Sequence, residues 1–133
     1  MAALHPFRAA VDKGDAAAFA ALLADDAVFH SPVAHKPYRG RDTVAAVLRA
    51  AFTVFEDVKY TQEISDPATG SHALVFKARI GPTEVHGCDL LTTDADGVIT
   101  DVTVMLRPMS AVHAMSEALR PQVETIAHAK AGC

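Results

Sequence analysis

The sequence predicts an α+β protein in which helices cover one face of a strongly curved antiparallel sheet. Up to about residue 54, apolar residues recur at the three- and four-residue spacing of amphipathic helices. From about residue 58 to residue 107, apolar and polar residues alternate, which is typical of strands with one buried face. Glycine, proline and aspartate interrupt this second half at regular intervals and predict tight turns. Helices followed by a run of strands indicate an α+β plan.

The first half is predicted to hold three helices and one short strand. The helices are expected over residues 2–13, 15–23 and 41–52, and the strand over residues 27–30. The first helix takes its apolar face from Leu4, Phe7, Ala10 and Val11. Gly14 ends this helix, and Asp15 caps the next one. Because the link between them is so short, the two helices must fold back on each other.

The second half is predicted to be a run of strands followed by a C-terminal helix. The strands are expected over residues 58–65, 71–80, 83–93 and 98–107, and the helix over residues 109–119. The turns contain Gly70, Gly81 and Gly97, and Gly97 is free to adopt a positive φ. Pro121 starts or kinks a further segment that runs to about Lys130.

Composition indicates one compact domain over residues 1–133. Half of the residues are hydrophobic and 21% are charged, which suits a packed core. The net charge of −4 argues against a nucleic-acid partner, because such proteins present basic surfaces. No apolar run approaches the length of a membrane span, and two cysteines, Cys88 and Cys133, make no disulfide framework. Without a recognisable signal peptide, a soluble cytoplasmic protein is expected.

Two stretches resemble a known superfamily. They read LLADDAVFHSPVAHKPYRGRDTVAAVL and CDLLTTDADGVITDVTVML. Both resemble the nuclear transport factor 2-like superfamily, in its SnoaL-like and ketosteroid isomerase-like branch. The resemblance covers about residues 4–107 and implies the cone-shaped NTF2-like (cystatin-like) fold. It does not imply one function, because this fold hosts enzymes, binding proteins and transport factors.

The resemblance also implies positions for three catalytic groups of the isomerases. The general base of those enzymes is an Asp before a Pro-Val pair, and here Ser31 occupies that position. An alkyl hydroxyl cannot abstract a proton without activation by a neighbouring base. The Tyr that donates to the developing oxyanion is replaced by Phe7. The second donor, a protonated Asp, is present as Asp89. Because only one of the three groups is retained, classical steroid isomerisation is not expected.

Strand alternation predicts which side chains line the interior of the cone. If Asp89 faces inward, so do Gly87 and Leu91, and a buried carboxyl group there must be paired or protonated. The predicted pocket is lined by Phe7, Val11, Leu48, Leu74, Phe76, Ala78, Leu91, Val102, Val104 and Leu106. These walls suit a small apolar ligand with one or two polar groups. The alternative is that the same residues fill one another and leave no cavity.

Several histidines lie near the predicted loop. His30 and His35 are candidates for a displaced general base, because imidazole has a suitable unperturbed pKa. In a strand, however, His30 would point opposite to Ser31. The spacing of the histidines, which lack nearby cysteine or carboxylate ligands, does not predict a metal site, and no cofactor is expected.

Two functions remain open from the sequence. The first is a protein that binds a small apolar molecule and catalyses proton transfer around Asp89, as an isomerase, cyclase or dehydratase. The second is a non-catalytic module for ligand binding or dimerisation, since the Asp and Tyr of the isomerases are absent. In either case the resemblance implies a homodimer, because relatives usually pair through the convex face of the sheet, and Thr103 and Met105 on that face suit such contact.

Overall fold

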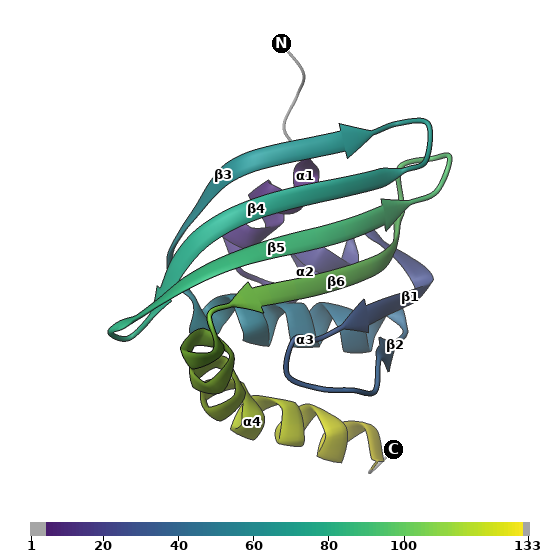
Figure 1. Cartoon of the computed structure of the whole chain (residues 1–133). Helices are drawn as coiled ribbons and strands as arrows, with labels where there is room; N and C mark the ends of the chain where they lie inside the picture. The colour runs from purple at the N-terminus through teal and green to yellow at the C-terminus, as the bar shows by residue number, and fades with distance from the viewer. Residues whose placement is uncertain (1–4, 132–133) are drawn as a thin grey trace.

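The structure is a computed structural model that describes residues 5–131, with side chains described up to Gln122. Its helices are α1 (Pro6–Lys13), α2 (Ala16–Ala20), α3 (Arg41–Val54) and α4 (Met109–Ala131). Its strands are β1 (Leu23–His30), β2 (Tyr38–Arg39), β3 (Glu56–Asp66), β4 (Ser71–Ile80), β5 (Thr83–Thr93) and β6 (Ile99–Arg107). The predicted α+β class is confirmed (Figure 1).

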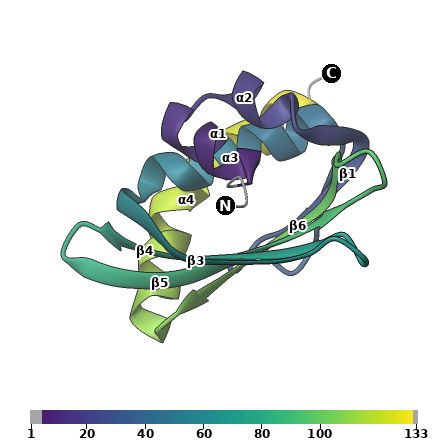
Figure 2. The ribbon, with the colours of Figure 1, turned by 90° about the horizontal axis from the view of Figure 1, so that it is seen from above.

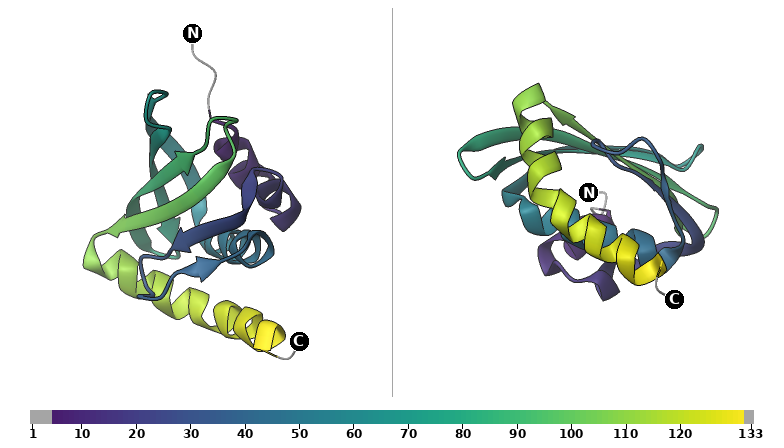
Figure 3. Two further views of the ribbon diagram at one scale, coloured as in Figure 1. Left: turned by 90° about the vertical axis from the view of Figure 1, so that its right-hand side faces the viewer. Right: turned by 90° about the horizontal axis from the view of Figure 1, so that it is seen from below.

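The six strands form one sheet in the order β2-β1-β6-β5-β4-β3. Strands β3 to β6 form an antiparallel meander, as predicted. Viewed from above, the sheet curves around the helices, with α1, α2 and α3 on its concave face (Figure 2). Helix α4 leaves the end of β6 and crosses the lower end of the molecule beside α3 (Figure 3). Asp89 and Tyr60 lie on the concave face, where the meander meets the helices.

Short-range capping explains where the first helices begin and end. The His5 Nδ1 atom accepts a hydrogen bond from the Phe7 backbone N–H at 3.1 Å, and Pro6 occupies the first turn. Gly14 ends α1 with a φ of 71°, a conformation that glycine adopts without strain. The Asp15 carboxylate then accepts from the Ala18 N–H at 2.7 Å and caps α2.

Three features differ from the sequence prediction. β1 begins at Leu23, where the prediction extended the second helix, because buried Leu23 pairs with Ile99 in the sheet. The exposed Asp25 and Asp26 lie at an irregularity of that pairing, and local polarity alone suggests a loop there. β1 also runs parallel to β6, so one pair of the sheet is not antiparallel. Helix α4 is continuous through Pro121, where the prediction started or kinked a separate segment. Residues 2–4 of the first predicted helix lie outside the described residues.

The core fills the space between the helices and the concave face. Phe52 of α3 is at its centre, and its ring contacts four other aromatic rings. These rings belong to Phe7, Phe19, Phe55 and Phe76, with centroid distances of 5.4 to 6.1 Å. Burial of such large rings is the main contribution to the stability of the fold. No helix within the described residues is long and apolar enough to cross a membrane.

Candidate functional site on the concave face

Strand register places the inward-facing side chains of the meander in rows across the sheet. One row is formed by Glu63, Leu74, Asp89 and Val104, which are successive partners on β3, β4, β5 and β6. The next row toward the start of β3 is formed by Tyr60, Phe76, Gly87 and Leu106. These rows place Asp89 on the inner face, which the sequence left open, together with Gly87 and Leu91.

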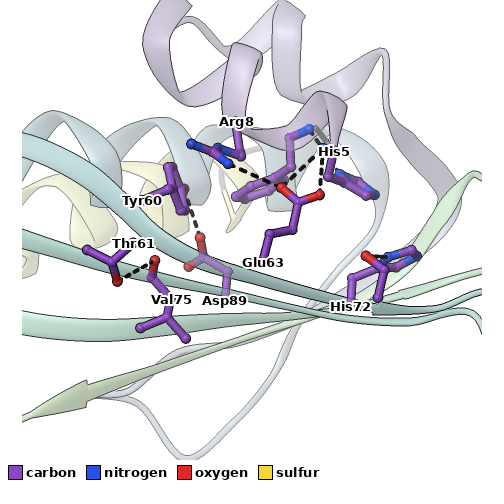
Figure 4. A network of polar contacts seen from close by, with 10 residues as sticks. His5, Arg8, Tyr60, Thr61, Glu63, His72, Val75 and Asp89 are labelled. Atoms are coloured by element: carbon purple, nitrogen blue, oxygen red, sulfur yellow. Dashed lines mark hydrogen bonds and ion pairs between the residues drawn. The ribbon is translucent and has the colours of Figure 1, made fainter. Parts of the chain in front are cut away.

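Asp89 lies among the inward-facing side chains of these two rows. Of the residues that the structure describes, it is the one charged residue that is fully buried, with 0% of its surface exposed. Its Oδ2 atom accepts a hydrogen bond from the Tyr60 hydroxyl at 2.9 Å (Figure 4). Its Oδ1 atom is also buried but has no hydrogen-bond partner among the described residues. A buried polar atom without a partner costs about 1–3 kcal/mol, so this arrangement is unusual in a folded protein.

Burial determines the protonation of the Asp89 carboxyl group. Removal from water disfavours the charged form and raises the pKa of Asp89 to about 8, although the hydrogen bond from Tyr60 acts in the opposite direction. Burial, followed by the nearby Asp89, raises the pKa of Tyr60 as well. At neutral pH both groups therefore carry their protons. Because Tyr60 donates to Oδ2, the proton of Asp89 belongs on Oδ1, where it is available to a ligand.

Tyr60 is a site residue that sequence reasoning missed. The expected alternation on β3 starting from Val58 does place Tyr60 inward, which was the available signal. After Tyr60, however, the pairing with β4 shifts by one residue. The shift turns Glu63 inward and leaves Ile64 61% exposed, which reverses the burial that the alternation alone predicts.

Further polar contacts connect β3 to helix α1. The Glu63 carboxylate accepts from the His5 backbone N–H at 3.0 and 3.3 Å and from Arg8 Nη1 at 3.4 Å. The Arg8 guanidinium lies 5.0 Å from the centre of the Tyr60 ring, in cation–π geometry. The His5 ring contacts the ring of His72 at 4.8 Å (Figure 4). These contacts place a polar cluster at the β3 side of Asp89.

The predicted pocket residues form the core around Asp89. Nine of them are buried, and Leu106 is partly exposed at the edge of the core. Leu74 and Val104 lie in the row of Asp89, and Phe76 lies in the next row, opposite Gly87. Its ring occupies the space above Gly87, and a Cβ atom at Gly87 would overlap that ring. In this conformation the predicted lining residues pack against one another.

The predicted loop residues lie away from the Tyr60–Asp89 pair. Ser31 follows the end of β1, and its Oγ atom accepts from the Val33 N–H at 3.2 Å. His30 pairs with Thr103 in the sheet and is exposed, as is His35. β1 ends at His30, the last residue paired with β6, so strand register does not place Ser31 in the row of Asp89. The hydrogen bond to Asp89 comes from Tyr60 and not from Ser31, His30 or His35.

His35 instead lines a cavity of about 460 Å³ between the loop and helix α4. The other lining residues are Pro32, Val33, Ala34, Val112, His113 and Ser116. Among the side chains that the structure describes, no group of three or more His, Cys, Asp or Glu is placed to hold a metal ion.

The convex face of the sheet carries a second, apolar surface. A groove of about 330 Å³ crosses it, and the residues that line it include Val75, Cys88 and Met105. Ile64, Leu90 and Met105 are exposed on the same face, Met105 to 51%. Cys88 is a free cysteine, and burial followed by the neighbouring Asp89 raises the pKa of its thiol. The strand pattern favours Cys88 as a small buried apolar residue, whereas the structure leaves it partly exposed in this groove.

Comparison with known proteins gives one family match and several structural matches. A model of the SnoaL-like domain matches residues 4–102. A steroid delta-isomerase from Pseudomonas aeruginosa is 38% identical, with a TM-score of 0.83, over 90% of this chain and 87% of that one.

An uncharacterised bacterial protein with a cystatin-like fold, from Silicibacter pomeroyi DSS-3, is 36% identical, with a TM-score of 0.84, over 94% of this chain and 90% of that one. An NTF2-like protein from Cytophaga hutchinsonii is 14% identical, with a TM-score of 0.63, over 80% and 88%, and supports the fold alone. No match was found among curated proteins.

Proposed function

Because the chain belongs to the SnoaL-like domain family, we propose that it binds a small apolar carbonyl compound on the concave face of its sheet. Asp89 donates a hydrogen bond from Oδ1 to the carbonyl oxygen, and Tyr60 holds Oδ2. The single observation that carries this proposal is the buried Oδ1 atom without a partner. A ligand oxygen would satisfy that atom and recover the free energy that its isolation costs.

The proposed chemistry is proton transfer next to the carbonyl group. When a proton leaves the carbon beside a carbonyl, negative charge develops on the oxygen. A neutral acid in an apolar site stabilises that charge more strongly than water does. Asp89, with its raised pKa, is suited to this role at neutral pH. The step also needs a base to accept the proton that leaves the carbon; with such a base, the proposed reaction class is isomerisation, cyclisation or dehydration through an enolate-like species.

Access to Asp89 is proposed from the end of the sheet where β3 begins and β6 ends. Four inward-facing apolar residues remain partly exposed there, namely Val58, Tyr60, Ile80 and Leu106. A ligand that enters along this route meets the Phe76 ring above Gly87 before it reaches Asp89. Binding therefore requires the Phe76 ring to move to another rotamer.

A non-catalytic binding module is the second candidate. Ser31 stands where the isomerases carry a base, and its hydroxyl is used in a turn with Val33. Phe7 is buried in the core and has no donor to offer. If no other group removes the proton, the same site binds a carbonyl compound without converting it.

A conjugated steroid ketone is a suitable probe, since a similar chain is a steroid delta-isomerase. Its affinity for the protein is measured by calorimetry at pH 6.5, and the matching unconjugated ketone is incubated to detect conjugation by absorbance. Asp89→Leu is expected to weaken binding by about 10-fold or more, the value of a hydrogen bond to a buried group. Asp101→Asn, a change at a partly exposed Asp of β6, is the matched control and is expected to bind normally.

The outcomes separate the candidates. Binding with conversion that Asp89→Asn abolishes supports the enzyme, whereas binding without conversion supports the module. Equal affinity of the wild type and Asp89→Leu would show that Asp89 is not the donor.

We also propose that a second copy of the chain covers the convex face. The apolar groove there lies between two rows of opposite charge. Across one end runs a basic row that strand register brings together, Lys59, Lys77, His86 and Arg107. Toward the other end lie Asp66 and Asp101. A twofold axis perpendicular to the strands would place the basic row of each copy on the acidic end of the other.

A further inference from the structure

The bulge in β3 brings a carboxylate inward at the expense of an apolar side chain. Without it, Ile64 would face the core and Glu63 would face solvent, which is the arrangement that burial energies favour. With it, Ile64 is 61% exposed and Glu63 faces α1. Bulges recur beside functional sites, where they redirect one side chain. The position of Glu63 therefore calls for a role that compensates for the exposure of Ile64.

Glu63 acts on helix α1 at two points. It accepts from the His5 backbone N–H, which fixes the start of the helix, and it pairs with Arg8 one turn later. Both charged side chains are largely buried, with 24% of Arg8 and 16% of Glu63 exposed. An ion pair shielded from solvent to this extent holds its geometry better than a surface pair does.

Arg8, held by Glu63, also contacts the ring of Tyr60. Its guanidinium group lies over the Tyr60 ring at 5.0 Å, while the ring of Phe76 contacts Tyr60 at 5.8 Å and 62°. Arginine is suited to both tasks at once, because its planar group can stack on a ring while one edge pairs with a carboxylate. The contacts thus run from Glu63 through Arg8 and Tyr60 to Asp89.

We propose that Arg8, anchored by Glu63, is a positioning residue that keeps the Tyr60 hydroxyl on Asp89 Oδ2 and so leaves Oδ1 directed toward the ligand. The inference rests on the proposed function of Asp89 and assigns roles to two residues outside the reacting pair. Without Arg8 the Tyr60 ring, which is only partly buried, would gain freedom to rotate away from the carboxyl group.

The surroundings of the pair determine what the loss of Arg8 would do. Arg8 and Asp12 of α1 are the charged groups that act on Tyr60 besides Asp89 itself. On β4 and β6, the row neighbours of Asp89 are apolar, Leu74 and Val104. Tyr60 is the group that opposes the effect of burial on Asp89. A weaker hydrogen bond from Tyr60 would therefore leave Asp89 protonated to a higher pH.

The test is the titration of the Asp89 carboxyl group in the free protein, followed by NMR with ¹³C-labelled aspartate. The Asp89 signal is assigned by its absence from Asp89→Asn. The wild-type midpoint is expected at about pH 8. Tyr60→Phe is expected to raise it by about one pH unit, and Arg8→Gln and Glu63→Gln by about half as much. Lys13→Gln, which removes an exposed cation from the same helix, is expected to leave it unchanged.

Two comparisons decide whether Arg8 acts through Tyr60. The double variant Arg8→Gln/Tyr60→Phe is expected to titrate like Tyr60→Phe alone, because no hydroxyl remains to be positioned. Additive changes in the double variant would overturn the proposal. So would a lower midpoint in Arg8→Gln, since water entering beneath a loosened α1 would move the pKa of Asp89 toward its ordinary value. Arg8→Lys separates charge from stacking, and a wild-type midpoint there would assign the effect to charge alone and overturn the positioning role.

The titration needs no ligand, so its outcome is independent of the proposed function. Binding of the conjugated steroid ketone to Arg8→Gln is measured in parallel. A shifted midpoint with no ketone binding in any variant would support the positioning role and contradict the proposed function. Normal ketone affinity in Arg8→Gln together with an unchanged midpoint would contradict the positioning role alone.

Discussion

Asp89 makes the folded state sensitive to pH over a wide range. In the unfolded chain its carboxyl group ionises near the ordinary pKa of 3.8, whereas burial raises the pKa in the folded state to about 8. Between these values the folded state holds a proton that the unfolded state has released. The contribution of this group to stability is therefore complete below pH 3.8 and is lost progressively as the pH rises toward 8.

Replacement of Asp89 by Asn is expected to stabilise the fold at neutral pH. Asn cannot ionise, so the free energy of unfolding at pH 7.5 is expected to rise by about 1–3 kcal/mol. This gain is smaller than the free energy that the wild type loses by keeping Asp89 protonated at pH 7.5, because the amide nitrogen of the introduced Asn would lack a hydrogen-bond acceptor. Urea denaturation at pH 7.5 and pH 4.5 measures it, with Asp96→Asn, at an exposed turn residue, as control. A gain of equal size at both pH values would contradict the linkage to ionisation.

The sequence could identify Asp89 but not its partner. A carboxyl group between Cys88 and Leu90 in an alternating strand is conspicuous, although the pattern leaves open which face it takes. The Tyr60 hydroxyl that bonds it comes from β3, which lies two strands away in the sheet. Alternation from Val58 puts Tyr60 on the inner face but does not show which residues it meets. The inward position of Glu63 depends on a shift in pairing that leaves no mark in the residue pattern, and the contact of Arg8 depends on how α1 packs on the sheet.

At the scale of elements, helix α1 is held to the sheet through His5. The neutral His5 ring caps the helix through Nδ1, and burial, followed by the neighbouring His72, lowers the pKa of His5 despite the opposing effect of Glu63. Because the pKa of His5 is lower in the folded state, this group contributes fully to stability above pH 6.5. That contribution is lost as the pH falls through the folded-state pKa. Protonation also puts a hydrogen on Nδ1, which then can no longer accept from Phe7.

Acidification is therefore expected to loosen α1 before the rest of the fold. Backbone amide signals of residues 7–13 in ¹⁵N NMR spectra are expected to change between pH 7 and about pH 5, while those of β4 and β5 do not. His5→Asn keeps a capping oxygen and removes the titration, so its α1 signals are expected to stay constant. His113→Asn, at an exposed position on α4, serves as the matched control. If the α1 signals of His5→Asn still change with pH as those of the wild type do, the assignment to His5 is refuted.

Helix and strand positions followed from the sequence wherever one period dominated. The alternation predicted β4 and β5 closely, and the caps at Gly14 and Asp15 predicted the end of α1 and the start of α2, although α2 ends at Ala20, before the predicted end. β1 was predicted too short because Asp25 and Asp26 interrupt its pattern, and only its distant partner β6 makes it a strand there. A parallel pairing between strands so far apart along the chain depends on tertiary packing rather than on local preference.

At the scale of the whole molecule, the convex face exposes three large apolar side chains, Ile64, Leu90 and Met105. Apolar area of this kind, flanked by opposite charges, favours association with a copy turned by 180°. Association would cover Met105 and Leu90 and would pair the basic row with acidic residues. The concave site would remain open, since it faces the other way.

Met105→Lys is expected to prevent this association. A charge at the centre of the apolar groove would be buried without a partner in the dimer, which costs several kcal/mol. Sedimentation velocity is expected to show a dimer for the wild type and a monomer for the variant. Met109→Lys, at a methionine on α4 that is 75% exposed, is the control and is expected to remain dimeric. A monomeric wild type at all concentrations would refute the proposed interface.

The pairing of β1 with β6 also orders events during synthesis of the chain. β1 has two neighbours, the two-residue strand β2 and the distant β6. Residues Phe29 and Val102 are partners across about 70 residues of chain, so β1 is made long before its main neighbour exists. Until β6 has been synthesised, β1 can pair only with β2. Completion of the sheet therefore waits until most of the chain has been made.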